Sequence, residues 1–534
     1  MSFSIRPIRD DRKTSPSFAR KALSFFSRAV EPLHNLYLLS QRKHEVEEEQ
    51  RANHVGILKK ALAVLIAILF AGLLLVGALR VLLAMKVFSI SQLVSVASTE
   101  LPVDDNGYTN VLLLGEGGAD HEGIDLTDTL MIASIDARHK EGVVMISLPR
   151  DLYVLNTELM GKGRINSLYR NYKSYLIGQG TAHPEAETES LKQLGTELGT
   201  LTGIPIHAVM KIDFNGFIQA VDSVGGVDVD VPEDIVDPEY PGPNYTFETF
   251  SITKGPHHLD GATALKYARS RHSTSDFSRS ARQQQIISAV VKKMRETGTI
   301  NNLGKISELV GIISKNFRST LNSRELMGLA LLGKGVDTTK IANIQLNDQN
   351  GLYGSLIQPG GFLYSPPRED FDGASVLLPV SIPAFPLTWK QIRTLAEVVV
   401  HHRDLFMQPA SIAVLNADAK EGAARKLGGE LYRYMFNVTS TKNYDKKATP
   451  AREGSYIVVR QAPTAAPSSA AGALDEAKAK AAKAKATADY LSKLLNLPVF
   501  DGTDAAALAD GNDVAIVLAG EYTYQPLQDI ALSK

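Results

Sequence analysis

The chain has 534 residues, a formal net charge of -1 and no cysteine. At roughly 100–200 residues per domain this length allows two or three domains, and the balanced charge gives no sign of a nucleic-acid-binding protein. The absence of cysteine excludes disulfides, thiolate metal sites and a cysteine nucleophile.

An uncharged apolar run occupies residues 61–79 and reads ALAVLIAILFAGLLLVGAL. A helix of this length spans roughly 28 Å, close to the hydrocarbon thickness of a bilayer. We therefore expect one transmembrane helix over 61–82. Basic residues are more frequent before the run than after it, which predicts a cytoplasmic segment 1–60 and an extracytoplasmic remainder. No DNA-reading motif is found in the cytoplasmic segment.

Segment 110–300 alternates strand and helix patterns, which predicts an α/β domain. The strand NVLLLG at 110–115 leads into a glycine-rich loop, GEGGADHEG. Two more strands are predicted at 128–136 and 143–151. If they form an antiparallel hairpin, Asp128 lies opposite Arg150. The pair is then either a structural ion pair or a site whose carboxylate holds Mg²⁺ and whose arginine holds phosphate oxygens.

The next segments supply loops and helices around this hairpin. GRINSLYRNY at 163–172 is interpreted as a polar and aromatic loop, and segment 213–235 as helix, glycine turn and strand. Segment 255–271 predicts a loop and a helix that delivers Arg269 and Arg271. Its adjacent histidines, His257 and His258, point apart and make a poor zinc chelate.

A basic stretch at 265–290, LKYARSRHSTSDFSRSARQQQIISAV, opens a helix whose later turns are apolar. Helical spacing puts Arg279, Arg282 and Gln283 on the apolar face. Unpaired burial of such groups is costly, so they predict an anionic partner, and several forked donors at a helix start suit a phosphate. The alternative is a solvated basic turn. Asp276 lies where an N-cap residue is expected.

The C-terminal part predicts a separate small α/β domain from Ser411 onward. SIAVLNA, SYIVVRQ and DVAIVLAG are predicted strands, and AARKLGGELYRYMF is an amphipathic helix. Residues 462–486 read as a Pro/Ser/Ala linker that merges into an alanine–lysine helix.

Seven of these segments, in this order, carry a resemblance to a known family: NVLLLG, TDTLMIASID, SLPRDLYV, INSLY, DFNGFIQAVDSVGGVDVDVP, HHLDGATALKYARSR and DFSRSARQQQ. The chain resembles the LytR-CpsA-Psr family of cell-wall glycopolymer ligases. The C-terminal part is similar to the extra domain that often accompanies this family.

The resemblance implies a mixed central sheet flanked by helices in a catalytic domain at 100–400, and a second domain at 410–525. It implies a membrane-anchored phosphotransferase that uses Mg²⁺ (or Mn²⁺) to move a glycopolymer from its polyprenyl-pyrophosphate carrier onto peptidoglycan through a phosphodiester. By motif, Asp128 would ligate the metal. The pyrophosphate would be held by Arg150, Arg269, Arg271, Arg279 and Gln283, with Asp276 orienting arginines. Of these, Arg150, Arg269 and Arg271 would also serve catalysis together with Asp128.

Two positions depart from the family pattern: Gly117 stands where the family usually has an aspartate, and Leu126 where it usually has an arginine. Asp125 then becomes the expected second metal ligand, with Asp120 as the alternative. The departures leave two other functions open, a non-catalytic lipid-carrier-binding or regulatory protein and a polyprenyl-pyrophosphate pyrophosphatase.

Overall fold

The structure is a computed structural model that describes residues 101–527, apart from 119–122, 137, 139–141, 243–245, 271–275, 300–301, 338–339, 352–355, 381–387, 408, 448, 450, 462–470, 503, 505 and 509. The predicted cytoplasmic segment 1–60 and transmembrane helix 61–82 lie outside the described residues. In the part of the chain that is described, no helix is long and apolar enough to cross a membrane.

The first domain contains both strands and helices, as predicted for an α/β fold, but several strands follow one another directly, so the alternation expected from the sequence is only partial. Its elements are β1 (Tyr108–Glu116), β2 (Thr127–Asp136), β3 (Val143–Leu148), β4 (Tyr153–Val154), β5 (Gly163–Arg164), α3 (Ile165–Gly178), α4 (His183–Thr202), β6 (Ala208–Asp213), α5 (Phe214–Ser223), β7 (Val227–Val231), β8 (Ile235–Pro241), β9 (Phe247–Ile252), β10 (Gly255–Leu259), α6 (Gly261–Arg269), α7 (Asp276–Glu296), α8 (Leu303–Ile313), β11 (Phe317–Ser319), α9 (Ser323–Gly335) and β12 (Ile341–Gln345).

A six-stranded mixed sheet forms the centre of this domain, in the order β11-β6-β1-β2-β3-β12. Strand β2 lies between β1 and β3 and pairs antiparallel with both, while β6 runs parallel to β1 and β12 parallel to β3. Apolar residues alternate between the two faces of each strand because successive side chains of a strand point to opposite sides.

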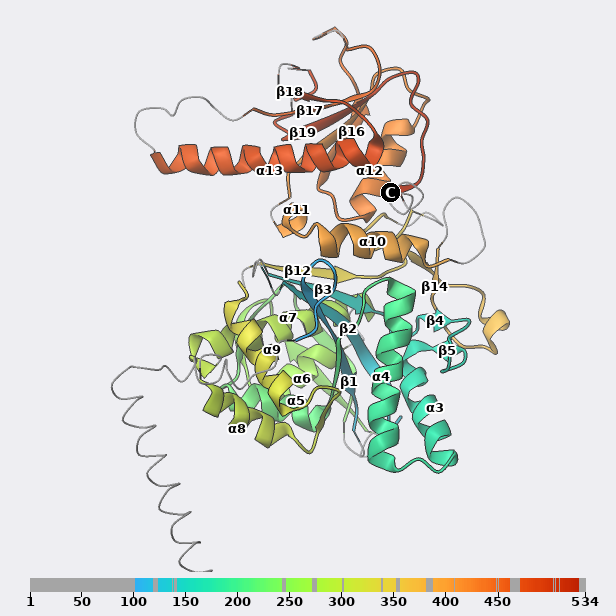
Figure 1. The fold of residues 1–534 in the computed structure, drawn as a ribbon, viewed down its shortest axis with the longest axis vertical. Coiled ribbons are helices and arrows are strands. Elements are labelled where there is room, and N and C mark those ends of the chain that lie inside the picture. The colour runs from blue at the N-terminus through green and yellow to red at the C-terminus, as the bar shows by residue number, and fades with distance from the viewer. Residues whose placement is uncertain are drawn as a thin grey trace, which may run out of the picture. The chain divides into compact units, whose positions relative to one another are not determined.

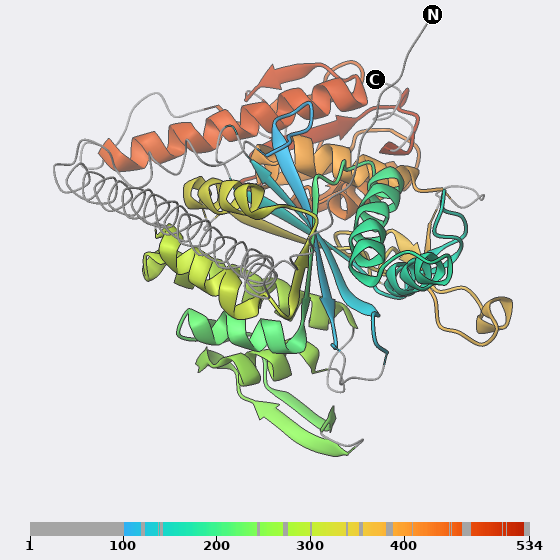
Figure 2. The same cartoon turned by 60° about the horizontal axis from the view of Figure 1, so that its bottom comes forward.

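Helices cover both faces of the sheet (Figures 1 and 2). On one face, α3 and α4 pack on Leu112, Leu114 and Leu130 through side chains such as Leu168 and Leu194. The apolar cluster on the opposite face is smaller. It consists of Met131, Ala133 and Met145, which lie against Ile287 of α7. The prediction of a mixed sheet flanked by helices is therefore confirmed for the described residues.

Segment 213–235 forms the predicted helix, turn and strand. Asp213 caps α5 by accepting from the Gly216 amide. Gly225 and Gly226 have φ of 85° and 77°, the left-handed conformation that a side chain disfavours. Two expectations differ from the structure: the loop predicted at 163–172 is mostly helix α3, and the loop predicted before α6 contains strand β10.

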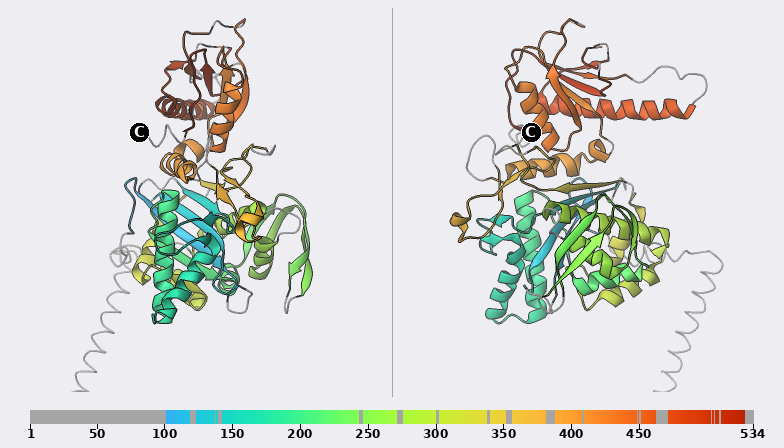
Figure 3. Two further views of the ribbon diagram at one scale, coloured as in Figure 1. Left: turned by 90° about the vertical axis from the view of Figure 1, so that its right-hand side faces the viewer. Right: turned by 180° about the vertical axis from the view of Figure 1, so that it is seen from behind.

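After the first domain come short elements and the C-terminal domain: β13 (Leu363–Tyr364), η4 (Arg368–Phe371), β14 (Leu378–Pro379), α10 (Lys390–His401), α11 (Asp404–Met407), β15 (Ile412–Asn416), α12 (Ala423–Arg433), β16 (Val438–Asn443), β17 (Tyr456–Val459), α13 (Ala471–Leu495), β18 (Val499–Asp501) and β19 (Val514–Leu518). A five-stranded sheet, β16-β15-β19-β17-β18, packs against α12 and α13 (Figure 3). The strands and the helix predicted from Ser411 onward are all present.

Candidate active site

The β2–β3 hairpin brings the first predicted pair together. Leu130 lies opposite Leu148, so the same antiparallel register places residue 128 opposite residue 150. Arg150 Nη1 lies 3.2 Å from Asp128 Oδ1, with 38% of the Asp128 side chain exposed. Asn166 of α3 donates to the same oxygen at 3.3 Å. The predicted juxtaposition is confirmed, and the Asp128 carboxylate is held in place while part of it stays open to solvent.

The strand register places several polar groups on one edge of the sheet. Glu116 ends β1 opposite Asp213, which ends β6, and it also faces Thr127 at the start of β2. Phe214 follows directly, and the Arg269 guanidinium lies 4.1 Å from the centroid of its ring. Arg269 also donates to the Tyr240 hydroxyl at 3.1 Å. The arginine at the end of α6 therefore lies by the same sheet edge as Asp128.

The predicted arginine cluster at the start of α7 contains side chains that are largely buried. Arg279 is 5% exposed, and Gln283 donates to the Ala268 carbonyl at 3.4 Å. Arg282 is 4% exposed, and its guanidinium donates to the carbonyls of Tyr267 and Ser270 at the C-terminal end of α6. Part of the donor capacity of Arg282, for which the sequence predicts an anionic partner, is therefore satisfied by backbone carbonyls.

Gln284 was not singled out by sequence reasoning, although it is buried. Its amide donates to Ser147 Oγ at 3.0 Å and to the Ile344 carbonyl at 3.1 Å. These bonds tie α7 to β3 and β12, so the polar start of this helix is partly a structural anchor. Arg271 and Asp120 lie outside the described residues, as does the side chain of Asp276, with which α7 begins.

Asp125, the predicted second metal ligand, is paired with lysine. Both of its carboxylate oxygens accept from Lys173 Nζ at 2.9 Å, and Lys211 Nζ lies 3.8 Å from Oδ1. Its backbone is left-handed, with φ of 63°, a conformation that aspartate tolerates better than most residues. The turn thereby directs the carboxylate toward α3.

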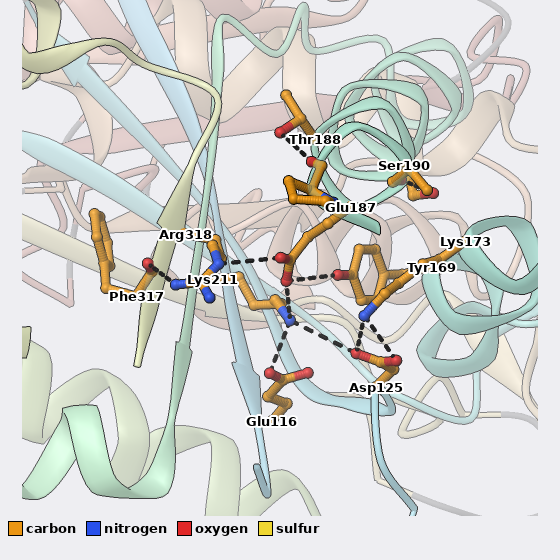
Figure 4. Close-up of polar contacts among 12 residues, drawn as sticks. Glu116, Asp125, Tyr169, Lys173, Glu187, Thr188, Ser190, Lys211, Phe317 and Arg318 are labelled. Atoms are coloured by element: carbon orange, nitrogen blue, oxygen red, sulfur yellow. Dashed lines mark hydrogen bonds and ion pairs between the residues drawn. The ribbon is translucent and has the colours of Figure 1, made fainter. Parts of the chain in front are cut away.

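Lys211 is the centre of a buried ionic cluster that sequence reasoning missed (Figure 4). Its side chain is 4% exposed, and its Nζ lies 2.7 Å from Glu116 Oε1 and 3.2 Å from Glu187 Oε1. The ammonium also lies 4.7 Å from the centroid of the Tyr169 ring, an attractive cation–π distance. Arg318 donates to the other oxygen of Glu187 at 3.0 Å.

The pKa values of Glu116 and Glu187 shift in opposite directions, although both carboxyls contact Lys211. Burial raises the pKa of Glu116 above its ordinary value, and Lys211 opposes this only in part. Burial also acts on Glu187, but Lys211 and Arg318 outweigh it and lower the pKa of that carboxyl. Burial and the neighbouring Glu187 raise the pKa of Tyr169, which donates to Glu187 at 3.2 Å. At neutral pH the cluster therefore holds Glu187 as a carboxylate.

A Mg²⁺ ion needs carboxylate oxygens that are free to coordinate it, usually one or two together with waters and substrate phosphates. Asp128 meets this requirement because its carboxylate is partly exposed. Asp125 does not meet it while Lys173 occupies both of its oxygens. Among the described residues there is no group of three or more His, Asp or Glu side chains that could hold a metal ion.

The sequence model of the LytR_cpsA_psr family matches residues 85–363, more than half of the chain. The chain belongs to the LytR-CpsA-Psr family. A second model, described as LytR cell envelope-related transcriptional attenuator, matches residues 410–522, which is the C-terminal domain.

Several named proteins and solved structures are similar to this family member. The cell wall biosynthesis protein LcpA of Corynebacterium glutamicum is 26% identical over 435 residues, which cover 76% of this chain and 71% of LcpA. The polyisoprenyl-teichoic acid–peptidoglycan teichoic acid transferase TagV of Bacillus subtilis is 30% identical over 225 residues, 41% of this chain and 51% of TagV.

A crystal structure of B. subtilis TagV aligns with a TM-score of 0.39 and 22% identity, covering 56% of this chain and 98% of that one. A structure of TagT bound to LIIa-WTA aligns with a TM-score of 0.38 and 22% identity, covering 58% and 96%.

Proposed function

We propose that this protein is a membrane-anchored phosphotransferase of the cell envelope. It would attach a glycopolymer, carried on polyprenyl pyrophosphate, to peptidoglycan through a phosphodiester. The apolar run at 61–79 would anchor it, with residues 1–60 in the cytoplasm and both folded domains outside the cell membrane. Relatives named as a cell wall biosynthesis protein and as teichoic acid–peptidoglycan transferases support this proposal.

The observation that carries the proposal is the shared sheet edge of Asp128, Arg150 and Arg269. Asp128 is the second residue of β2, Arg150 follows β3, and Arg269 lies on Phe214 directly after β6. Two guanidinium groups and a partly open carboxylate at one edge suit a pyrophosphate with its cation. No cysteine is available, and phosphoryl transfer needs positioning and charge stabilisation more than a protein nucleophile.

In the proposed reaction a sugar hydroxyl of peptidoglycan attacks the phosphorus next to the glycopolymer. A new P–O bond forms, the bond to the bridging oxygen breaks, and the polyprenyl phosphate leaves as the hydroxyl proton is lost to solvent. Arg150 and Arg269 would bind phosphate oxygens and stabilise the charge that moves onto the leaving phosphate. Arg271, Arg279 and Gln283 remain predicted pyrophosphate contacts.

The cofactor also remains a proposal. Asp128 would hold Mg²⁺ or Mn²⁺, which neutralises phosphate charge when bound. Asp125 would join it only after release from Lys173, and Asp120 stays an alternative ligand.

Turnover by the full-length chain in detergent distinguishes the open functions. The substrate is a short-chain polyprenyl pyrophosphate carrying a disaccharide, the acceptor is a soluble peptidoglycan oligosaccharide, and mass spectrometry follows the products. A phosphodiester-linked product supports the transferase. Polyprenyl phosphate released by water alone would establish a pyrophosphatase, and binding without turnover a lipid-carrier-binding protein.

Asp128→Ala tests the site within the same assay. We expect loss of metal-dependent turnover with a nearly unchanged melting temperature, since a partly exposed ion pair contributes only about 0–1 kcal/mol. Asp151→Ala is a suitable control, because Asp151 also lies near Arg150, 3.6 Å from its Nε. Full turnover by a folded Asp128→Ala variant would place the cation site elsewhere.

A further inference from the structure

One face of α3 carries side chains that contact both predicted metal ligands, Asp128 and Asp125. Asn166, Tyr169 and Lys173 are spaced by three and four residues, so they follow one side of the helix. Asn166 donates to Asp128 and Lys173 donates to Asp125. Tyr169 lies between them, fully buried, and its ring has the Lys173 ammonium 5.7 Å from its centroid. The helix thus holds the two carboxylates in different ways, one by a neutral amide and the other by a cation.

The lysine contact closes Asp125 to a metal ion in the ligand-free protein. Lys173 binds both carboxylate oxygens at 2.9 Å, and Lys211 stands behind them at 3.8 Å (Figure 4). A divalent cation arriving alone at this carboxylate would meet the two ammonium groups and be repelled. Within the described part of the cluster negative charge does not exceed positive charge, because Glu116, Asp125 and Glu187 are matched by Lys173, Lys211 and Arg318.

An anion arriving alone is opposed for the complementary reason. Lys173 is a candidate phosphate donor, with 14% of its side chain exposed, but its charge is already neutralised by Asp125. A pyrophosphate near Lys173 would therefore also face the Asp125 carboxylate. When cation and anion arrive together, each can take one member of the ion pair, so the opposition from the Lys173–Asp125 pair is removed.

We propose that Lys173 couples cation binding to pyrophosphate binding by exchanging partners. In the free protein Lys173 holds Asp125. When a pyrophosphate arrives with its divalent cation, the ammonium moves to a phosphate oxygen and Asp125 is released to the cation. One ion pair is lost and two are formed, with no change in total charge. The flexible four-carbon stem and rotatable donors of lysine suit such an exchange, whereas Lys211, at 4% exposure, stays in the cluster. This inference rests on the proposed function.

Coupling of this kind is reciprocal, because each ligand must strengthen the binding of the other by the same factor. A residue that blocks one ligand and binds the other also leaves a recognisable signature. Its removal should strengthen binding of the cation alone and weaken binding of the pyrophosphate. A purely structural lysine would shift both affinities in the same direction or neither.

The test uses the full-length chain in detergent, Mn²⁺ as the cation probe and farnesyl pyrophosphate as the carrier probe. Electron paramagnetic resonance measures the affinity for Mn²⁺ alone, and calorimetry measures the affinity for farnesyl pyrophosphate with and without Mn²⁺. For Lys173→Met we expect Mn²⁺ alone to bind about tenfold more tightly than to wild type. Farnesyl pyrophosphate in saturating Mn²⁺ should bind about tenfold more weakly, as expected for one lost charge-assisted contact.

Asp125→Asn gives the opposite pattern and keeps the proposal testable if Lys173→Met folds poorly. It frees Lys173, so metal-free farnesyl pyrophosphate should bind more tightly while Mn²⁺ no longer strengthens it as much as in wild type. Lys292→Met is the matched control, since that lysine is 65% exposed on α7 and pairs only loosely with Glu296 at 3.9 Å. It should match wild type in every measurement.

Two results separate this inference from the function on which it rests. If farnesyl pyrophosphate fails to bind the wild type in saturating Mn²⁺, the proposed function is overturned and the coupling with it. If it binds wild type and a folded Lys173→Met variant equally, or if Mn²⁺ affinity does not rise in that variant, the coupling alone is overturned.

Discussion

Two buried cations, Lys211 and Arg282, are held on opposite faces of the central sheet by different chemistry. Lys211 lies under α3 and α4 with carboxylates from β1 and α4, whereas Arg282 of α7 donates to backbone carbonyls at the end of α6. A compact ammonium needs concentrated negative charge nearby, while a planar guanidinium can spread its donors over several carbonyl dipoles. The last carbonyls of a helix have no partner within the helix itself. Neutral backbone acceptors can therefore satisfy part of the donor capacity of a buried arginine in this fold.

The largest loss of stability is expected for a substitution of Lys211. Lys211→Met would leave Glu116 and Glu187 buried without their shared cation, and removing one partner of a buried ion pair typically costs about 3–5 kcal/mol. We expect a large fall in melting temperature, greater than for a change at Arg282, in thermal unfolding of the full chain. Lys442→Met in the C-terminal domain is the control, because its pair with Asp510 is 44% exposed on both sides. Equal stability of Lys211→Met and wild type would contradict a stabilising role for this cluster.

A smaller loss is expected at Arg282. Arg282→Met keeps much of the buried stem and removes the donor from the Tyr267 and Ser270 carbonyls. It leaves neutral acceptors without this donor, whereas Lys211→Met leaves buried carboxylates without their cation. Thermal unfolding should show the loss, and Arg282→Lys should restore only part of it because an ammonium cannot reproduce the fork. Unaltered farnesyl pyrophosphate affinity in the folded protein would confirm the structural role. A stable variant that loses that affinity would reverse our assignment.

Arg269 lies just thirteen residues from Arg282, but we assign it to pyrophosphate binding and Arg282 to a structural role. Arg269→Ala should weaken farnesyl pyrophosphate binding by roughly ten- to a hundredfold, at about 1.4 kcal/mol per decade. Farnesol, which lacks phosphate, should bind wild type and variant equally. Calorimetry with both ligands measures the effect, and equal loss for the two would point to a folding defect instead.

The smallest effect is a pH dependence whose sign is the test. Because the pKa of Glu187 is lowered, its contribution to stability is present above its ordinary pKa of about 4.3 and is lost as the pH falls through the lowered value. The stability advantage of wild type over Glu187→Gln should therefore shrink on acidification. The pKa of Glu116 is raised, so its contribution is present below about 4.3 and is lost as the pH rises through the raised value. The stability of wild type relative to Glu116→Gln should therefore increase as the pH falls. If the difference in melting temperature between wild type and each variant does not change with pH, the opposite pKa shifts of Glu187 and Glu116 are contradicted.

Local patterns in the sequence were enough to predict the hairpin and its ion pair. Two apolar strands joined by a short polar turn have one symmetric register, and that register alone sets residue 128 opposite residue 150. The glycine pair at 225–226 and the strands of the C-terminal domain were predictable for the same reason, since turn chemistry and strand alternation are local properties. Helix α3 was missed because no side chain caps its start at Arg164.

The lysine cluster could not be predicted from local patterns, because its members come from β1, the β1–β2 loop, α3, α4, β6 and β11. Glu116 and Lys211 are 95 residues apart, and Lys173 and Asp125 are 48 apart. One signal was present: Lys211 interrupts the otherwise apolar start of the strand AVMKID. A lysine in a strand that continues a central sheet requires a buried counter-charge, and that would have directed attention to nearby acids. The carbonyl partners of Arg282 were equally hidden, since backbone groups leave no trace in the residue pattern.

The order of strands in the sheet has a consequence for how the site is assembled during folding. The β2–β3 hairpin needs only a short loop to close, so Asp128 and Arg150, separated by 22 residues, can meet early. The cluster around Lys211 must wait until α3 and α4 have crossed over and β6 has paired with β1. The outer strands β11 and β12 come later still in the chain, at 317–319 and 341–345. A chain interrupted just before β6 would therefore expose the Glu116 and Glu187 carboxylates without their lysine, and quality-control proteases would encounter a half-formed sheet with an unpaired edge beside β1.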